Sequence, residues 1–592
     1  MLTIDSNTKL NNEYYDFIIV GAGTAGCVLA RELFYNIPNI NILVLEAGPP
    51  DTHINDIMRL PCAYSMVRHT SETDWGYSTE DQRMPSTVDP TEEVLNKGFP
   101  YPRGKVIGGC STVNAMAYMR GHKADYDLWA AQDPEYIIWN YDHCLEAFKA
   151  VENNARKDPD VEFENYHGFN GLLYVQDPAV DELDISKDVF KVVRKFGIPY
   201  NKDFNGAKQN GVGRYQFTMK DGKRFTLADG YLKDALKNVT VYPPKPFIEG
   251  HPHAPGDDNV GKFVAVNVKS FAHMLNIIWD EKKKDENVAI GVRYSYNGKV
   301  HNCYIAPKGE VIICGGAINS PQILMLSGIG PKKNLENNSI KVRKELPVGH
   351  NLWDHPFCIV TASVSVPNST SASIFNYSSY GVDFVSFYKG NIEGKIPSRE
   401  ELNDERPDIQ QISGAVLFDK GIIAEHPTDK KEFYSMLTAL NIPSSVGHLE
   451  LRSSDPFAHP KIFVNYYDKP EDLYRMMSSL KLSRKILEQP PLSTYWGVKV
   501  IGLDEVNDDK EWENYIRKRT ISSAHPCGTV KMAPESKGGC VNHRLQVYGT
   551  KNLRVVDASI FPTIPAGNLN APTAMVAWRA SKLIKEDYYK KV

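Results

Sequence analysis

The chain has 592 residues and a mass of 66.5 kDa, a length that suits about two to four domains. Hydrophobic residues make up 42% and charged residues 24%, which excludes a mainly disordered chain because the apolar content suffices for a packed core. The formal net charge of −4 leaves no basic excess for binding nucleic acid or an anionic membrane.

The cysteine pattern and the two ends of the chain bear on the cellular compartment. Nine cysteines occur at irregular spacings without a Cys-x-x-Cys pair, so we expect neither a disulfide framework nor a metal site. Residues 1–13 contain no apolar segment of the signal-peptide type, and the last residues match no organelle-retention signal. These features predict a cytoplasmic protein in a reducing environment.

Two stretches without a charged residue, 311–331 and 558–578, could be mistaken for membrane spans. Each contains several glycine or proline residues, and neither is predominantly apolar over the roughly 20 residues that cross a bilayer. We expect both to be buried, turn-rich segments, and we expect no membrane association.

The first predicted elements have the order of a dinucleotide-binding unit. Residues 17–20 are a short apolar run typical of a central parallel strand. They lead into GAGTAG at 21–26, which has the pattern GxGxxG, and residues 27–35 follow with apolar side chains four apart, as on one face of a helix. A second apolar strand is predicted at 42–45.

The glycines of this pattern, and the acid that ends the second strand, each have a role in such a site. Gly21 permits the tight turn, Gly23 lets the backbone approach a pyrophosphate, and Gly26 lets helix and strand pack closely. Glu46 lies 20 residues after Gly26, where a carboxylate accepts hydrogen bonds from ribose hydroxyls. We therefore predict adenine-dinucleotide binding; the alternative is an α/β turn with chance glycines. The motif does not separate NAD from FAD, but its place at the start of a long chain favours FAD.

A second glycine-rich segment follows a long turn-rich region. Residues 102–116, PRGKVIGGCSTVNAM, are dense in small side chains, which allow the backbone to press against a flat or charged ligand. The alternative is a tight glycine loop without a ligand.

The central part of the chain is predicted from local patterns. Residues 125–155 have the pattern of a helix, and another helix is expected to begin at Tyr231. We also predict strands at 263–268, 274–279 and 311–314 and a helix at 318–327. Residues 357–500 are richer in serine, tyrosine and alternating strand-like runs, namely 384–387, 409–412 and 448–451. These runs predict a second, sheet-based domain, from which the chain returns to the first near residue 520.

Five histidines merit comment. His251 and His253 lie in a proline-rich loop without a third ligand, which favours plain surface over metal binding. His350 and His355, in GHNLWDHP at 349–356, are expected to fix a loop by hydrogen bonds rather than to act in catalysis. His525, in HPCGTVKM at 525–532, suits a general base or acid because histidine titrates near neutrality. From spacing alone, a structural histidine remains the favoured interpretation.

Taken in order, these motifs resemble those of the glucose–methanol–choline (GMC) family of flavin oxidoreductases, over residues 14–586. The matching segments are GAGTAG at 21–26 with Glu46, the run at 102–116, the segment at 311–331 that includes SGIGP, GHNLWDHP at 349–356, HPCGTVKM at 525–532, LRVVDASIFP at 553–562 and NLNAPTAM at 568–575. The resemblance implies an α/β fold with a Rossmann-type FAD-binding domain and a substrate domain on a mostly antiparallel sheet. The expected boundaries are 14–356 and 520–590 for the FAD domain, with substrate-domain insertions near 155–220, and 357–519 for the substrate domain.

The resemblance also implies roles for individual residues. His525 matches the catalytic histidine of the family, and Asn568 matches the second active-site position, which is Asn in the choline-oxidising members. Val113 falls where some members have a histidine bonded covalently to FAD, so the FAD is expected to be noncovalent. The residues expected to bind the cofactor are Gly21, Gly23, Thr24, Ala25, Gly26, Glu46, Ala47, Arg103, Val106, Gly108, Gly109, Ser111, Asn114, Ala115, Met116, Asp557, Ala558, Asn568, Pro572 and Thr573.

The function implied by the resemblance is FAD-dependent oxidation of an alcohol, in the manner of alcohol oxidases and choline dehydrogenase-like members. His525 would take the hydroxyl proton, Asn568 would hold the alkoxide-like oxygen, and O₂ or another acceptor would take up the electrons. A primary alcohol is favoured. Alternatives are a hydroxynitrile lyase that keeps the flavin without redox change, and an FAD-binding protein without catalysis. The run at 102–125 also resembles formate oxidases, but those have arginine where this chain has Asn568. The oligomeric state, monomer or homodimer, stays open.

Overall fold

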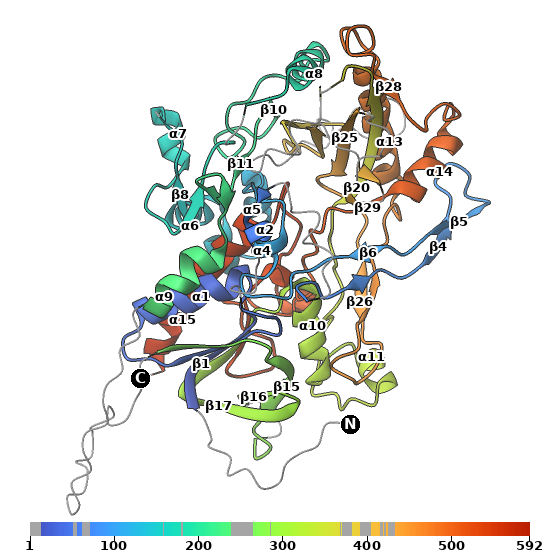
Figure 1. The fold of residues 1–592 in the computed structure, drawn as a ribbon. Coiled ribbons are helices and arrows are strands. Elements are labelled where there is room, and N and C mark those ends of the chain that lie inside the picture. Colours follow the sequence, from blue (N-terminus) through green and yellow to red (C-terminus); the bar gives the residue numbers. More distant parts are fainter. Residues whose placement is uncertain are drawn as a thin grey trace, which may run out of the picture.

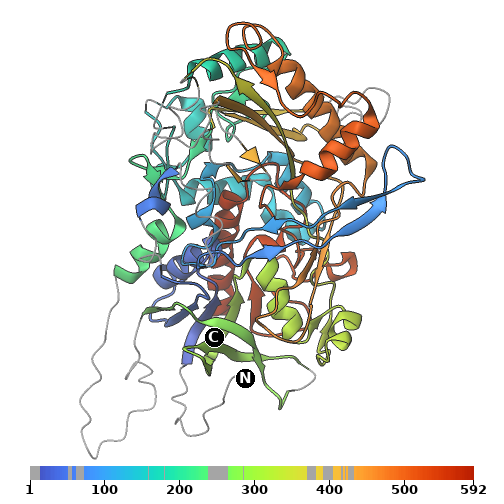
Figure 2. The same cartoon turned by 45° about the vertical axis from the view of Figure 1, so that its right-hand side comes forward.

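The computed structural model describes residues 14–50, 56–61, 72–157, 159–178, 181–237, 265–283, 286–367, 369, 382–390, 404–414, 418–419, 422–423 and 432–591. The histidine pair at 251 and 253 lies outside these residues. Figures 1 and 2 show two sheets in opposite halves of the molecule, with the polypeptide near residues 100–130 and 520–570 between them.

The first sheet contains the predicted dinucleotide-binding strands. Its parallel part has the order β14 (Val266–Lys269), β2 (Ile42–Leu45), β1 (Tyr14–Val20), β17 (Lys299–Ile313) and β30 (Leu553–Val555). The antiparallel strands β16 (Ala289–Tyr296) and β15 (His273–Trp279) extend it from the first half of β17. Strands β1 and β2 are buried almost throughout, as expected of central parallel strands covered on both faces.

Helices cover this sheet, and two of them begin at the carboxyl ends of its parallel strands. Helix α1 (Thr24–Asn36) follows β1 after the glycine turn and packs against α15 (Asn570–Lys590). Helix α15 packs in turn on α6 (Tyr141–Val151). Helix α10 (Gly316–Leu326) follows β17 and contacts β15. The chain thus begins and ends in one α/β unit, which confirms the predicted fold class.

The second sheet is antiparallel. Its order is β10 (Gly211–Gly213), β21 (Phe384–Tyr388), β22 (Ile409–Gly414), β25 (Glu432–Leu440), β20 (Pro356–Val364) and β28 (Lys499–Val500), and β29 (Ile521–Ser522) also pairs with β20. Helix α13 (Pro470–Leu487) packs on β25 and β20. The predicted strand at 448–451 differs, because β26 (His448–Glu450) pairs only with β27 (Lys461–Phe463) in a separate ribbon.

Two predicted helices have different bounds. The pattern at 125–155 is broken into α5 (Lys123–Ala130), the 3₁₀ helix η3 (Pro134–Trp139) and α6. The break falls at Asp133-Pro134, since proline restricts the residue before it and lacks the N–H that a continuing helix needs. Near Tyr231, a π-helical turn, η4 (Ala228–Leu232), precedes the short helix α9 (Lys233–Lys237), so helical structure begins three residues earlier than predicted.

The two charge-free stretches are built into this fold. Residues 311–331 pass through β17, α10 and β18 (Ile329–Gly330), and 558–578 pass through η6 (Ala558–Ile560) into α15. In the part of the chain that the structure describes, no helix combines the length and the apolar character needed to cross a bilayer.

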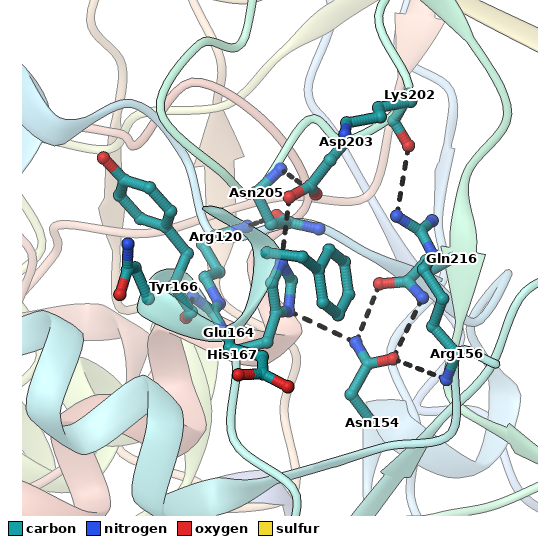
Figure 3. A network of polar contacts seen from close by, with 12 residues as sticks. Arg120, Asn154, Arg156, Glu164, Tyr166, His167, Lys202, Asp203, Asn205 and Gln216 are labelled. Atoms are coloured by element: carbon teal, nitrogen blue, oxygen red, sulfur yellow. Dashed lines mark hydrogen bonds and ion pairs between the residues drawn. The ribbon is translucent and has the colours of Figure 1, made fainter. Parts of the chain in front are cut away.

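A buried polar network holds the segment that follows the glycine-rich run 102–116 (Figure 3). His167 contacts Glu152 through Nδ1 at 3.0 Å and Asp203 through Nε2 at 3.1 Å, and its ring stacks on Phe163. Arg120 pairs with the same Glu152, and both side chains are almost fully buried. This network is tied to the site described below, because β7 (Ala117–Tyr118) directly follows the glycine-rich run and pairs with β11 (Gln216–Phe217).

Both carboxylates of the network are stabilised in their charged form. Burial alone would raise the pKa of Glu152, but Arg120 and His167 outweigh it and lower that pKa below its usual value. Burial also opposes ionisation of Asp203, and His167 again lowers the pKa. A carboxyl group whose pKa is lowered in the folded protein stabilises the fold at pH values above its ordinary, unfolded-state pKa. This stabilisation is lost as the pH falls through the folded-state pKa.

We predict that Glu152→Gln destabilises the protein by about 3–5 kcal/mol at pH 7, because it leaves the buried Arg120 without its counter-charge. The measurement is the shift of the urea unfolding midpoint. As a matched control, Asp160→Asn removes an exposed partner of Lys202 and should cost less than about 1 kcal/mol. The deficit of Glu152→Gln relative to wild type should shrink below pH 4. Equal effects of the two variants at pH 7 would contradict the proposed importance of the network.

Candidate active site

A single cavity runs between the two sheets. On the side of the parallel sheet it is lined by the glycine turn after β1, the end of β2, the run 102–117 and the start of α10. On the side of the antiparallel sheet it is lined by apolar residues of β20, β22 and β25, with His525 and Asn568 between the two ends. The starts of α1, α10 and α15 reach this cavity, so three helix N-termini contribute partial positive charge to it.

The glycine turn has the shape that the sequence predicts for close backbone approach. Gly21 has φ of +106°, and a Cβ there would lie 2.4 Å from the carbonyl oxygen of Cys314. A Cβ at Gly26 would lie 1.9 Å from the carbonyl oxygen of Gly21, and one at Gly109 would lie 2.7 Å from the Cα of Gly23. At Gly23 itself, the nearest atom to an added Cβ is 3.9 Å away. Protein packing thus requires glycine at positions 21, 26 and 109, whereas the space beside Gly23 opens toward the cavity.

Two buried carboxylates lie on the same side of the cavity. Glu46 accepts hydrogen bonds from the backbone N–H groups of Ala22 and Gly48, each at 2.9 Å. Burial nevertheless raises its pKa to about 7. Asp557 accepts from the backbone of Gly316 and Ser559 and from the Ser320 hydroxyl, and burial raises its pKa as well. Each Glu46 oxygen accepts one of these backbone hydrogen bonds and retains a lone pair, so Glu46 can still accept a further hydrogen bond from a ligand.

His525 and Asn568 meet in the middle of the cavity. The Asn568 Nδ2 lies 3.2 Å from His525 Nε2. The residue before the histidine, Ala524, has φ of +61°, a left-handed conformation that is uncommon for a residue with a side chain. It is held there by Arg103 Nη1, which donates to the Ala524 carbonyl at 2.6 Å, and by the Ser522 hydroxyl, which accepts from its N–H at 2.7 Å.

The backbone beside His525 pairs with the segment that contains His355. Trp353 and Cys527 exchange two hydrogen bonds of 3.0 Å, and the Ser523 N–H donates to the His355 carbonyl. This pairing places the two imidazoles at right angles, with 3.0 Å between their Nδ1 atoms. Burial lowers the pKa of His355 to about 3, so its ring is neutral. His355 therefore forms a hydrogen bond as predicted, but with the candidate base rather than only within its own loop.

Asp354 anchors this arrangement from outside the cavity. Its buried carboxylate accepts from the backbone N–H groups of His355 at 2.8 Å and His525 at 3.0 Å. The other oxygen accepts from the hydroxyls of Tyr101 and Tyr466, each at 2.6 Å, and of Ser522. Burial raises its pKa.

Most residues expected to bind a cofactor line this cavity. They are Gly21, Gly23, Thr24, Ala25, Glu46, Ala47, Arg103, Gly109, Asn114, Ala115, Met116, Asp557, Ala558, Asn568 and Thr573. Five others, Gly26, Val106, Gly108, Ser111 and Pro572, do not. They shape its walls instead; for example, Gly108 donates its N–H to the Ala22 carbonyl, and Ser111 donates its hydroxyl to the Gly108 carbonyl.

Sequence reasoning missed Gln410, Asp354 and the apolar residues of β20, β22 and β25. Gln410 is buried, lines the cavity, and donates from Nε2 to Asn568 Oδ1 at 3.3 Å and to the hydroxyl of Tyr215. Nothing in the strand pattern around Gln410 distinguishes it from its neighbours. For Asp354, its position next to His355 within GHNLWDHP was the available signal.

Comparison with known proteins identifies the family. The N-terminal part of the model for GMC oxidoreductases matches residues 15–242 and 259–357, and the C-terminal part matches 443–577. The chain is a member of the GMC oxidoreductase family. This result confirms the resemblance predicted from the motifs, and the protein is an oxidoreductase.

This GMC oxidoreductase has relatives along its whole length. It is 32% identical over 582 residues to an alcohol dehydrogenase [acceptor] of Pseudomonas putida, covering 96% of this chain and 95% of the relative. It is also 32% identical over 597 residues to the mitochondrial choline dehydrogenase of Mus musculus, covering 98% and 90%. Among solved structures, a formate oxidase variant of Aspergillus oryzae, studied for FAD modification, superposes with a TM-score of 0.81 at 22% identity, covering 98% and 100%. That last similarity shows the fold.

We predict that Asp354→Asn destabilises this GMC oxidoreductase by about 1–3 kcal/mol, because the amide nitrogen must face either two backbone N–H groups or three hydroxyls. Thermal unfolding would measure the loss. Tyr466→Phe is the matched control, since it removes one hydrogen bond of the same carboxylate and should cost about 1 kcal/mol. An Asp354→Asn variant as stable as Tyr466→Phe would show that Asp354 does not organise the site.

Proposed function

We propose that this GMC oxidoreductase binds FAD noncovalently and oxidises a primary alcohol to an aldehyde, with His525 as the base. The observation that carries the proposal is the contact between His525 and Asn568 in a cavity continuous with the GxGxxG turn. The names of the relatives support the substrate class, since one is an alcohol dehydrogenase and the other a choline dehydrogenase.

The residues of the cavity fit FAD. The open space at Gly23 lies at the start of α1, whose N-cap has no side chain, so the first-turn N–H groups are free to bind a pyrophosphate. Glu46 retains accepting capacity for a ribose. Val113, with a hydrocarbon side chain, lines the cavity where some family members have a histidine bonded to FAD, which supports noncovalent binding. We propose residues 14–356 and 520–590 as the FAD-binding domain and 357–519 as the substrate domain, with insertions from 155–220.

The side chains of the cavity support a proposed division of the reaction into steps. His525 Nε2 would accept the hydroxyl proton of the alcohol, and the Asn568 amide would donate to the oxygen as its negative charge grows. When bound, the flavin supplies an acceptor for the hydride from the carbon that bears the hydroxyl. The electron acceptor that reoxidises the enzyme, O₂ or another molecule, is set by access and charge beside the flavin.

Apart from Gln410, the substrate end of the cavity is mainly apolar. Beyond His525 and Asn568 it is lined by Phe357, Ile412, Leu437, Ala439 and Ile521. Among the described residues, the only carboxylates that line the cavity are Glu46 and Asp557, both on the parallel-sheet side. A quaternary ammonium substrate such as choline needs a carboxylate or a cage of several aromatic rings. Phe357 is the one aromatic residue among those named at this end, so we propose an uncharged alkyl or aryl alcohol rather than choline.

The test is an anaerobic absorbance scan of the purified protein with a panel of alcohols, followed by air. We expect an uncharged primary alcohol to bleach the bound flavin, choline to do so poorly, and His525→Gln to lower the bleaching rate about 10²–10⁴-fold while the flavin stays bound. Unchanged bleaching by His525→Gln would remove the histidine from the base role. If no alcohol bleaches the flavin, the oxidation proposal fails, and cyanohydrin cleavage becomes the assay. Rapid return of colour in air would indicate an oxidase.

We also predict that Gly23→Ala loses FAD without loss of fold. The added Cβ meets no protein atom closer than 3.9 Å, but it occupies the space proposed for the pyrophosphate. The flavin-to-protein absorbance ratio should fall, while the apoprotein unfolds within about 0.5 kcal/mol of wild type. Gly26→Ala provides the contrast, because its Cβ would clash with the Gly21 carbonyl and should destabilise the apoprotein itself. Full flavin content in Gly23→Ala would refute the assigned position.

A further inference from the structure

The active-site pair belongs to a longer chain of hydrogen bonds that crosses the cavity. From one end, Gln410 Nε2 donates to Tyr215 and to Asn568 Oδ1, Asn568 Nδ2 faces His525 Nε2, and His525 Nδ1 faces His355 Nδ1. Tyr215, Gln410 and His355 are buried, so water does not compete at the two ends of the chain, whereas His525 and Asn568 in its middle are half-buried and line the cavity. A chain of this kind has only two self-consistent directions, because each group must donate to the next or accept from it.

The His355 end is compatible with both directions. Burial lowers the pKa of His355 to about 3, so its imidazole is neutral and has a single ring proton. A neutral imidazole has one donor and one acceptor nitrogen, so the His355 Nδ1 can either donate to the His525 Nδ1 or accept from it. The direction is decided at the other end of the chain.

The hydrogen bonds of Gln410 and Asn568 decide the direction. Gln410 is donor to Asn568 Oδ1, which leaves the Asn568 amide nitrogen as the group that faces His525. An amide nitrogen donates and does not accept. The Nε2 of His525 therefore holds the lone pair that the proposed base needs, and in this structure that lone pair accepts from Asn568. The proton of His525 then lies on Nδ1, which donates to the Nδ1 of His355.

We propose that Gln410 and His355 are positioning residues that fix His525 in the tautomer with an unprotonated Nε2, ready to accept the proton of the alcohol. This inference rests on the proposed function and deepens it. Gln410 sets the orientation of the Asn568 amide, and His355 accepts from Nδ1 both before and after the proton transfer. Neither residue needs to exchange a proton with the substrate.

The test compares two substitutions of nearly equal size, Gln410→Glu and Gln410→Met. An ionised carboxylate at this position accepts only, so it would turn the Asn568 amide and place Oδ1 against His525 Nε2, which reverses the chain. Methionine removes the donor without reversing it. At a pH where the introduced carboxyl is ionised, we expect the limiting rate of flavin reduction in Gln410→Glu to fall at least about 10-fold below that of Gln410→Met, since a base held in the wrong tautomer loses most of its effect. The apparent substrate Kd should change far less than this rate.

A second pair of variants tests the other end. His355→Gln retains a side-chain oxygen that accepts from Nδ1, whereas His355→Leu does not. We expect His355→Gln to retain at least about ten times more of the limiting reduction rate than His355→Leu.

A direct readout is the ¹⁵N spectrum of histidine-labelled holoprotein without substrate. The signals of His525 are assigned by their loss in His525→Gln. We expect an unprotonated Nε2 in wild type and a protonated Nε2 in Gln410→Glu. The proposal is overturned if Nε2 is protonated in wild type, or if Gln410→Glu matches Gln410→Met in both rate and spectrum. Because these results require a wild-type flavin that an alcohol reduces, failure of the proposed function is seen separately, as wild-type flavin that no alcohol bleaches.

Discussion

The buried carboxylate of Asp354 is the constraint on which the geometry of the active site depends. A charge placed in a protein interior must be surrounded by donors, and the five donors here come from Tyr101, His355, Tyr466, Ser522 and His525. These residues are far apart in sequence. Satisfying one acid therefore brings together the strand pairing at 353–357, the loop at 521–527 and the walls of the cavity. Asp354 itself lies outside the cavity and organises the site without lining it.

The half of the site that we propose for the cofactor depends on a different requirement, close approach of backbone to backbone. At Gly26 and Gly109 the neighbouring main chain occupies the space of a side chain, whereas at Gly23 that space belongs to the cavity. The GxGxxG pattern thus combines two demands, packing within the protein and room for a ligand. The same reasoning explains why Gly26 is part of the GxGxxG pattern although it does not line the cavity. Gly108, in the run 102–116, is favoured instead by its φ of +88° and by the Thr112 hydroxyl, which lies 2.3 Å from the position of an added Cβ.

The sequence predicted the parts of the molecule that are set by local chemistry. The apolar strand at 42–45 was predicted with its exact bounds, because its continuous burial leaves a strong pattern. The prediction of one continuous helix at 125–155 was wrong, because Pro134 interrupts the helix. The spacing of apolar residues, on which the prediction was based, does not register this effect of proline on the backbone. The family motifs led to His525 and Asn568, which the structure places 3.2 Å apart. Gln410 could not be predicted, because its role depends on the pairing of β22 with β25 and on a distant tyrosine.

The two members of the active-site pair are supported by different halves of the molecule. The segment before His525 forms β29, which pairs with β20 of the antiparallel sheet, whereas Asn568 directly precedes α15, which packs on α1 beside the parallel sheet. The hydrogen bond between them therefore forms only when the two halves are correctly aligned. A small loosening of the antiparallel half would separate the proposed base, His525, from the Asn568 amide while leaving the glycine turn and its neighbouring helices in place. In such a molecule, catalytic competence would be lost before the ability to hold a dinucleotide, so activity is the more sensitive measure of the native arrangement.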